Sequence, residues 1–303
     1  MSKRLIYLIL LSVALMWGTT YVGSKAVLHM VPPTVAAMIR WGFATLFLAP
    51  LYLVRKVEKP RGREWIMVAL VGMLGVGLYQ ALFFGGLHYT TSSDATMILS
   101  VGNPGFTVLF TLLFFRQRLS QKQLIGFTIA FIGAILFFST LQQTNHVDAD
   151  RLIGIGFMIL TACCGAWYAI LAGRLMKRFD SLLISIICTF AGTLLLTLMA
   201  LPELQSVNWK QLPWQFWLVE IFLGLFPSAL ANLLYFKAIE LVGASLAISV
   251  NYLVPIISLW LSSLLLNDTI TLVQIMGSLI MIIGVWLIQQ QTEEINNRKY
   301  KSG

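Results

Sequence analysis

Ten long stretches of this sequence are apolar and almost free of charged side chains, and they limit strongly what the chain can fold into. A helix that crosses a lipid bilayer needs about 20 mostly apolar residues, and each stretch comes close to that length. The stretches are Leu5–Ser24, Thr34–Val54, Trp65–Leu87, Ala95–Phe115, Gln123–Leu141, Leu152–Ala172, Leu182–Leu201, Trp214–Phe236, Ala244–Leu266 and Leu272–Ile288. We therefore expect ten transmembrane helices joined by short loops.

The composition excludes several other classes of protein. Charged residues make up 11% of the 303 residues and hydrophobic residues 58%, with a mean hydropathy of +0.83. Soluble domains carry about 25% charged residues, so a globular enzyme with a separate aqueous domain is excluded. The apolar runs are continuous rather than alternating, which argues against an outer-membrane barrel. The expected fold class is an all-α membrane protein.

The positions of Lys and Arg predict the orientation of the helices, because cytoplasmic loops carry an excess of these residues. If the N-terminus is cytoplasmic, 17 of the 21 Lys and Arg residues lie on the cytoplasmic side, and only Lys25, Arg151 and Lys210 lie opposite. We therefore expect a multi-pass protein of the cytoplasmic membrane with both termini cytoplasmic. This distribution explains the net charge of +9 without a nucleic-acid partner.

The second half of the sequence repeats features of the first. A shift of 151 residues places four residues of the first half on identical residues of the second, and a shift of 150 places Trp17 on Trp167. The four pairs are Pro104 and Pro255, Gln123 and Gln274, Gly126 and Gly277, and Gly133 and Gly284. We expect two five-helix repeats, residues 1–145 and 146–303. Because five is odd, the second repeat would be inverted, as in many secondary transporters.

Several short motifs, taken in order, resemble a known family. They are Met16-Trp17-Gly18 followed by Lys25, the proline-centred fourth stretch from Asp94, Gln123 to Gly133, Tyr235-Phe236-Lys237-Ala238, Pro255, and Leu266 to Thr271 with Gly277 and Gly284. The chain resembles the ten-helix, EamA-type members of the drug/metabolite transporter superfamily. The resemblance implies transport, most often efflux, of a small metabolite such as an amino acid. Where this family usually has Gly-Glu, the chain has Arg116-Gln117 and Asn267-Asp268.

Polar and aromatic side chains recur at helical spacing within the stretches and form candidate cavity faces. The alternative is that such side chains bond between packed helices. The residues expected to bind substrate are Trp17, Tyr21, Lys25, Arg40, Gln80, Ser100, Asn103, Trp167, Asn232, Tyr235 and Asn251. Among them, Arg40 and Lys25 would attract a carboxylate or phosphate, or else extend to the membrane interface. The three cysteines show no metal-ligand spacing, and no metal or cofactor is expected.

Three further residues have candidate roles in the transport cycle. Glu220 is the acid well inside a stretch, and ionisable groups in a membrane are usually functional. It could carry a coupling proton, bind a substrate amine, or form a structural ion pair with Arg40. Pro104 and Pro255 each remove a backbone donor and free a carbonyl one turn earlier. Each could act as a hinge or as a static kink.

Two transport functions, with different classes of substrate, remain open. The first is a secondary or facilitative transporter that exports a small zwitterionic or anionic metabolite by alternating access. The alternative is a polyspecific exporter of drugs or cations coupled to protons, for which Glu220 would be the acid. No catalytic motif points to an enzyme. The expected partners are a small-molecule substrate, the lipid bilayer and a candidate coupling proton; a monomer suffices, and a homodimer is an alternative.

Overall fold

The computed structural model of the chain describes residues 3–54, 60–115, 120–139, 149–258, 260 and 271–301. Within these ranges all regular structure is helical and there is no strand. In chain order the elements are α1 (Lys3–Gly18), α2 (Thr20–Val27), α3 (Pro33–Val54), α4 (Arg63–Gly72), the π-helix η1 (Met73–Leu78), α5 (Tyr79–Tyr89), α6 (Ser92–Phe115), α7 (Gln121–Phe138), α8 (Ala149–Leu175), α9 (Ser181–Ala200), the 3-10 helices η2 (Leu201–Ser206) and η3 (Trp209–Gln211), α10 (Trp214–Leu223), the π-helix η4 (Gly224–Leu230), α11 (Ala231–Val242), α12 (Ala244–Ala247), the 3-10 helix η5 (Ile248–Tyr252) and α14 (Leu272–Lys301).

Eight helical stretches are long and apolar enough to cross a membrane, and they coincide with the first eight expected from the sequence. They are Leu5–Val27, Pro33–Tyr52, Arg63–Tyr89, Asp94–Phe114, Gln121–Phe138, Ala149–Leu175, Ser181–Ser206 and Trp214–Val242. Two shorter apolar helices, Ile248–Ser258 and Leu272–Ile288, lie within the ninth and tenth. The all-α prediction is confirmed for the described ranges, whereas the count of ten and the orientation of the termini stay predictions.

Parts of several sequence predictions lie outside the described residues. These are the ends of the fifth and ninth stretches at Leu141 and Leu266, the pairs Arg116-Gln117 and Asn267-Asp268, and the boundary between the two proposed repeats at residues 145 and 146.

Two of the long helices change their winding at the same relative position. The π-helices η1 and η4 begin at Met73 and Gly224, which are 151 residues apart, the same shift that relates the two halves of the sequence. Each replaces a turn of α-helix in the middle of its apolar stretch. Single π-turns of this kind often occur at functional sites, and both of these segments border the cavity described below.

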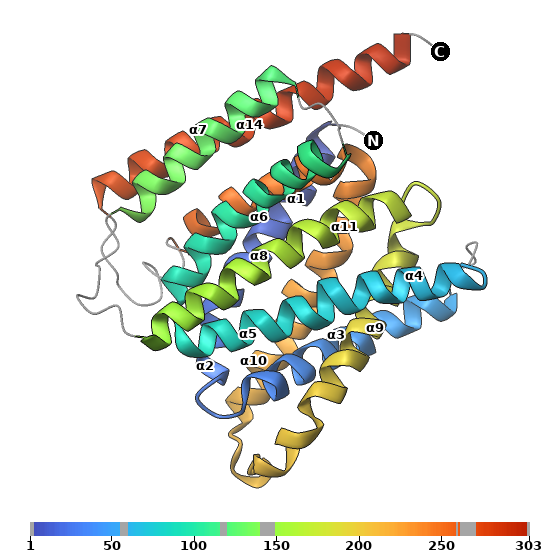
Figure 1. The fold of residues 1–303 in the computed structure, drawn as a ribbon, viewed down its shortest axis with the longest axis vertical. Helices are drawn as coiled ribbons and strands as arrows, with labels where there is room; N and C mark the ends of the chain where they lie inside the picture. The colour runs from blue at the N-terminus through green and yellow to red at the C-terminus, as the bar shows by residue number, and fades with distance from the viewer. Residues whose placement is uncertain are drawn as a thin grey trace.

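The helices α7 and α14 lie side by side along one edge of the bundle (Figure 1). Their facing glycines let the two backbones meet: a methyl group added at Gly133 would lie 2.9 Å from the carbonyl oxygen of Gly277, and one at Gly284 would lie 2.7 Å from that of Gly126. The glycine spacing in the sequence predicts this close approach, and the structure confirms it.

The repeated glutamines have a structural explanation. Ser120 and Gln123 form a reciprocal capping box at the start of α7: the Gln123 N–H donates to the Ser120 hydroxyl at 3.2 Å, and the Ser120 N–H donates to Gln123 Oε1 at 3.0 Å. At the start of α14, Thr271 and Gln274 make the same two bonds, at 3.3 and 2.9 Å. Gln123 and Gln274 therefore cap helices.

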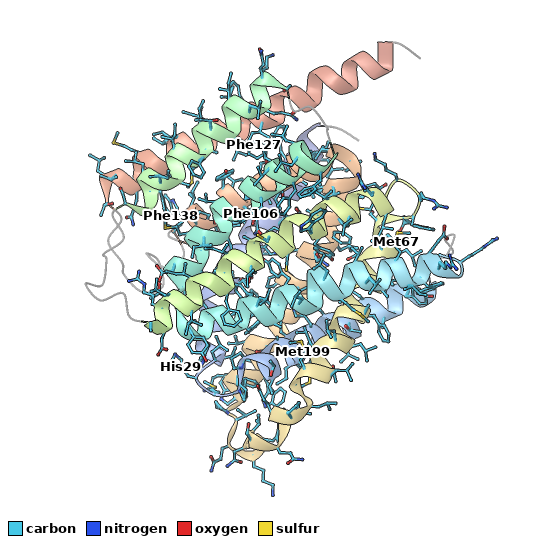
Figure 2. All side chains as sticks on the ribbon, viewed as in Figure 1. His29, Met67, Phe106, Phe127, Phe138 and Met199 are labelled. Carbon is cyan, nitrogen blue, oxygen red and sulfur yellow. The ribbon has the colours of Figure 1, made fainter. Side chains whose placement is uncertain are left out.

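The hydrophobic core has two parts. The larger joins α1 to α6 with α8 to α11, and the smaller lies between α7, α14 and Tyr252. Phe127 and Phe138 of the smaller part lie on α7 (Figure 2). Many large apolar side chains on the outer faces of the helices are exposed, among them Leu113, Phe190 and Trp214, as expected for contact with lipid.

Candidate functional site

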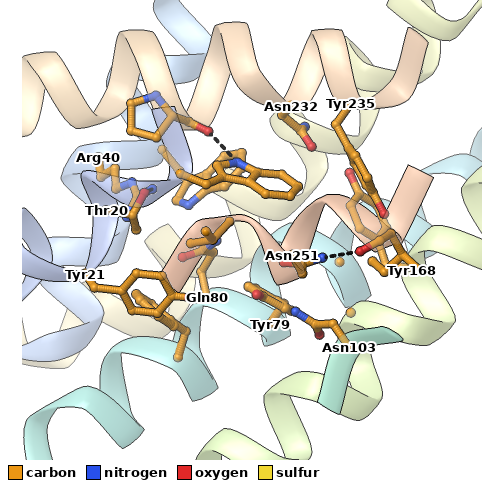
Figure 3. A pocket seen from close by; sticks show the side chains of 18 residues that line it. Thr20, Tyr21, Arg40, Tyr79, Gln80, Asn103, Tyr168, Asn232, Tyr235 and Asn251 are labelled. Carbon is orange, nitrogen blue, oxygen red and sulfur yellow. Dashed lines mark hydrogen bonds between the residues drawn. The ribbon is translucent and has the colours of Figure 1, made fainter. Parts of the chain in front are cut away.

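A cavity lies in the middle of the bundle, bordered by both π-helices. It comprises about 810 Å³ of space between atoms, a volume that includes the open space at its mouth. Its 18 lining residues are drawn in Figure 3. Eight of the eleven residues expected to bind substrate line it: Trp17, Tyr21, Arg40, Gln80, Asn103, Asn232, Tyr235 and Asn251. They come from the first four predicted spans, the eighth and the ninth. The structure therefore brings together residues that are far apart in the sequence.

Among the described residues that line the cavity, Arg40 of α3 is the one with a charged side chain. It is 2% exposed, and three hydroxyl groups hold its guanidinium. Nε donates to Ser228 at 2.6 Å, Nη1 donates to Ser24 at 3.1 Å, and Nη2 donates to Thr20 at 3.5 Å. These hydroxyls position the guanidinium without neutralising it, because none of them carries a charge.

Glu220 of α10 lies near Arg40 without bonding to it. It is 0% exposed, and neither of its carboxylate oxygens has a hydrogen-bond partner among the described residues. The two groups interact electrostatically, but no described carboxylate lies within 4.0 Å of the Arg40 nitrogens. A direct ion pair between Arg40 and Glu220 is therefore absent in this conformation. The buried guanidinium has no carboxylate bonded to it among the described residues, and a buried charge without such a partner is costly.

Aromatic rings form another part of the cavity wall. Trp17 packs against Tyr235 with ring centroids 5.0 Å apart, and its indole Nε1 donates to the Pro227 carbonyl at 3.2 Å. Tyr21 meets Phe83 edge-to-face at 5.8 Å. Because the indole nitrogen already donates to a carbonyl of η4, Trp17 presents its apolar ring to the cavity.

Several polar atoms of the lining residues are buried without a partner. They include Trp41 Nε1, Gln80 Oε1 and the Tyr235 hydroxyl oxygen. Buried polar groups in native proteins are nearly always bonded to protein, water or ligand. All three atoms belong to residues that line this cavity.

Three residues expected to bind substrate lie away from the cavity. Ser100 is buried in α6 outside the lining. Trp167 of α8 stacks on Phe110 at 5.1 Å, and its neighbour Tyr168 lines the cavity instead. A shift of 151, rather than the 150 used above, pairs Trp17 with Tyr168, and a step of one residue turns a helix by about 100°. That rotation is the physical reason why Trp167 lies outside the lining and Tyr168 lies within it.

Lys25 also lies outside the cavity lining. Its ammonium group donates to the carbonyl oxygens of Leu87 and Thr90 at 2.6 and 2.8 Å, at the end of α5. The same end of the bundle holds a two-bond pair in which Arg151 Nε and Nη2 each donate to Asp94 at 2.9 Å. Cations are favoured at the carbonyl end of a helix, so Lys25 holds α2 against α5.

We expect Lys25→Met to destabilise the protein while leaving substrate affinity unchanged. Methionine keeps the length of the side chain but donates no hydrogen bond, so the carbonyls of Leu87 and Thr90 lose their donor at a cost of about 1 kcal/mol. Thermal denaturation in detergent would measure the loss, and counterflow in proteoliposomes would give the KM of the transported substrate. A tenfold rise in KM would place Lys25 in the binding site after all.

The two candidate hinge prolines differ in their surroundings. Pro104 lies inside the continuous helix α6. Pro255 follows η5, where Asn251 Nδ2 donates to the Ile248 carbonyl at 3.1 Å. The backbone before Pro255 is thus 3-10 rather than α, and the hinge role of each proline stays a prediction.

Some lining residues were not predicted from the sequence. Thr20, Trp41, Tyr79, Phe83 and Tyr168 line the cavity, and Ser24 bonds to Arg40 together with Ser228, which belongs to the polar stripe of the eighth predicted span. Thr20 and Ser24 share one face of α2 at a spacing of four residues, which is a signal that could have been used. Trp41 and Tyr79 directly follow or precede predicted residues and carry no separate signal.

The comparisons with known proteins agree on a family. The model of the EamA-like transporter family matches residues 4–139 and again residues 152–290. Over 283 residues the chain is 26% identical to a protein named uncharacterized transporter YyaM from Bacillus subtilis (strain 168), covering 92% of each chain. A protein of Streptantibioticus cattleyicolor, named probable terminal-alkyne amino-acid exporter, is 24% identical over 238 residues, covering 78% of this chain and 77% of that protein. A solved crystal structure shares the fold, with a TM-score of 0.74, 17% identity and coverage of 97% and 99%.

Proposed function

The chain belongs to the EamA-like transporter family, and from this premise we propose that it exports a small zwitterionic or anionic metabolite, an amino acid or a related compound. Arg40 is the observation that carries the proposal. A buried guanidinium that only neutral hydroxyls hold binds a carboxylate strongly, because a charge-assisted bond to it replaces no existing anion. The name of the Streptantibioticus relative, an amino-acid exporter, supports the same class of substrate.

The mechanism we propose is alternating access in the cytoplasmic membrane. Residues 1–145 and 146–303 would form two inverted five-helix repeats with both termini cytoplasmic, and the cavity would lie between them near the midplane, as in other secondary transporters. The pair of α7 and α14 would join the two halves. The helices that carry η1 and η4 would rearrange, with Pro104 and Pro255 as candidate hinges.

A cation exporter is the second candidate, and Glu220 is the observation that favours it. Its buried carboxylate has no hydrogen-bond partner among the described residues, and aromatic rings such as Trp17 and Tyr235 can attract a cation. Arg40 opposes this function, since its charge on the cavity wall would repel a cationic substrate. An amino acid meets both features, with its carboxylate at Arg40 and its ammonium group near the ring of Trp17.

Counterflow in proteoliposomes separates the two functions. Vesicles preloaded with an unlabelled solute would be offered the same solute in labelled form, with neutral, aromatic and cationic amino acids tested beside a lipophilic cation. We expect uptake of at least one amino acid and none of the lipophilic cation. Uptake of the lipophilic cation alone would reject the metabolite exporter and direct attention to Glu220.

We expect Glu220→Gln to remove any coupling to protons. Glutamine keeps the size of the side chain, replaces one accepting oxygen by a donating NH₂ group, and cannot take up or release a proton. Uptake driven by an imposed pH gradient should fall to the rate seen without a gradient, while counterflow at equal pH continues. Glu64→Gln, at the exposed start of α4, is the matched control. An unchanged response of the Glu220 variant to the gradient would show that the carboxyl is structural.

A further inference from the structure

Figure 3 shows that the cavity has two chemically different ends. Arg40, Thr20 and Tyr21 lie at one end, and Asn232, Tyr235 and Tyr168 lie at the other. The side chains of Tyr79 and Asn103 complete the second end. We refer to Tyr79, Asn103, Tyr168, Asn232 and Tyr235 as the amide–phenol cluster. Four different helices, α5, α6, α8 and α11, supply it.

The amide–phenol cluster is rich in hydrogen-bonding groups that the protein itself uses incompletely. Tyr79 faces Asn103, and Tyr168 faces Asn232. Among the described residues, the Tyr235 hydroxyl and Asn103 Oδ1 have no hydrogen-bond partner, although both residues are at most 5% exposed. An amide offers donors and an acceptor at once, and a phenol does both through a single oxygen. The cluster can therefore bind a group that both donates and accepts.

The cluster also lacks charge. Among the described lining residues, Arg40 alone carries a formal charge, and it lies at the opposite end of the cavity. A charged group at the cluster would lose its hydration without gaining a counter-ion. A purely apolar group would leave the polar atoms of Tyr235 and Asn103 without a partner, whereas an amide or a hydroxyl can bond to them and so gains binding free energy.

We propose that the amide–phenol cluster is a second subsite that selects amino acids whose side chains end in a neutral hydrogen-bonding group, an amide or a hydroxyl. This inference rests on the proposed function, because Arg40 must hold the carboxylate while the cluster binds the other end of the same molecule. Trp17, whose ring contacts Tyr235, covers the apolar atoms of the substrate between the two ends.

Pairs of amino acids of similar shape test the subsite. Counterflow would be measured with labelled glutamine against methionine and tyrosine against phenylalanine, with lysine and glutamate as charged probes. Sites built to bond a polar group reject an analogue that lacks it by large factors. We expect kcat/KM to favour the polar member by about tenfold or more in at least one pair, with neither pair reversed, and lysine and glutamate to be poor substrates.

Variants of the cluster assign the preference to these residues. Tyr235→Phe removes one hydroxyl and keeps the ring, and Asn232→Leu replaces the amide by an apolar group of similar shape. Each should lower the ratio of polar to apolar substrate by about fivefold, whereas Tyr89→Phe, at the exposed end of α5, should leave it unchanged. Melting curves in detergent would show that Tyr235→Phe is folded. The test therefore does not depend on Asn232→Leu, which replaces a buried amide and perturbs the structure more.

The outcomes separate this inference from the function on which it rests. Transport that requires Arg40 but favours the apolar or the charged member overturns the subsite alone. The same holds if the ratio is unchanged in Tyr235→Phe and Asn232→Leu. If no amino acid exchanges at all, the proposed function fails, and the subsite fails with it.

Discussion

Arg40→Ala should reduce counterflow of the amino-acid substrate by at least about a hundredfold while the protein still inserts and folds. The substitution removes the buried cation to which the substrate carboxylate binds, and a charge-assisted, two-bond contact of this kind contributes about 3 kcal/mol or more. The released hydroxyls of Thr20, Ser24 and Ser228 can bond to water in the space that the side chain leaves. The measurement is initial-rate counterflow, with membrane expression and melting temperature recorded beside it.

Two control variants make this result specific. Arg40→Lys keeps the charge but cannot bond to Ser228, Ser24 and Thr20 in the same planar arrangement, so we expect it to retain some transport with a raised KM. Arg178→Ala removes an arginine whose side chain is 67% exposed and pairs with Glu64 at 2.8 Å, and it should transport normally. Retained transport by Arg40→Ala would remove Arg40 from the binding site and reopen the cation exporter.

Gly133→Leu should cause a large loss of stability. The added side chain would begin 2.7 Å from the Met281 backbone nitrogen, 2.9 Å from the Gly277 carbonyl oxygen and 2.9 Å from Ile280 Cγ2, so two of the three nearest atoms belong to backbone that cannot easily move aside. Overpacking typically costs about 1–3 kcal/mol and occasionally more. We expect little monodisperse protein after extraction, or a melting temperature lowered by many degrees, with α7 and α14 separated.

Gly105→Leu is the matched control, because this glycine of α6 is exposed and has no heavy atom within 4 Å of an added methyl group. It should express and melt like the parent protein. If Gly133→Leu behaved like Gly105→Leu, the contact between α7 and α14 would not hold the two helices together as the structure indicates.

Features that depend on the average hydrophobicity of a long segment could be predicted from the sequence. The first eight membrane stretches were placed correctly, because apolar length alone determines where a chain can cross a bilayer. The approach of α7 to α14 was predictable too, since Gly126 and Gly133 in one helix and Gly277 and Gly284 in the other are each seven residues apart and so share a helix face. The two π-helices were not predicted, because no pattern of residue types marks where a turn widens by one residue.

The site could be predicted only to the level of a helix face. Polar spacing selected Asn103, Asn232 and Asn251, and all three line the cavity. Trp167 was chosen in place of Tyr168 because a one-residue uncertainty in the repeat shift rotates the chosen side chain by about 100°. The hydroxyls that hold Arg40 come from α2 and η4, some 200 residues apart, and such a meeting depends on tertiary packing.

The contact between α7 and α14 has a mechanical consequence. Where side chains interlock, two helices can exchange one set of rotamers for another and slide by small steps. Between Gly133 and Gly277, and between Gly126 and Gly284, backbone approaches backbone closely, so these contacts themselves order no long side chain, while the larger side chains of the smaller core pack beside them. The two helices should therefore tilt together as one rigid unit. Movements of the other helices would then take place relative to this pair.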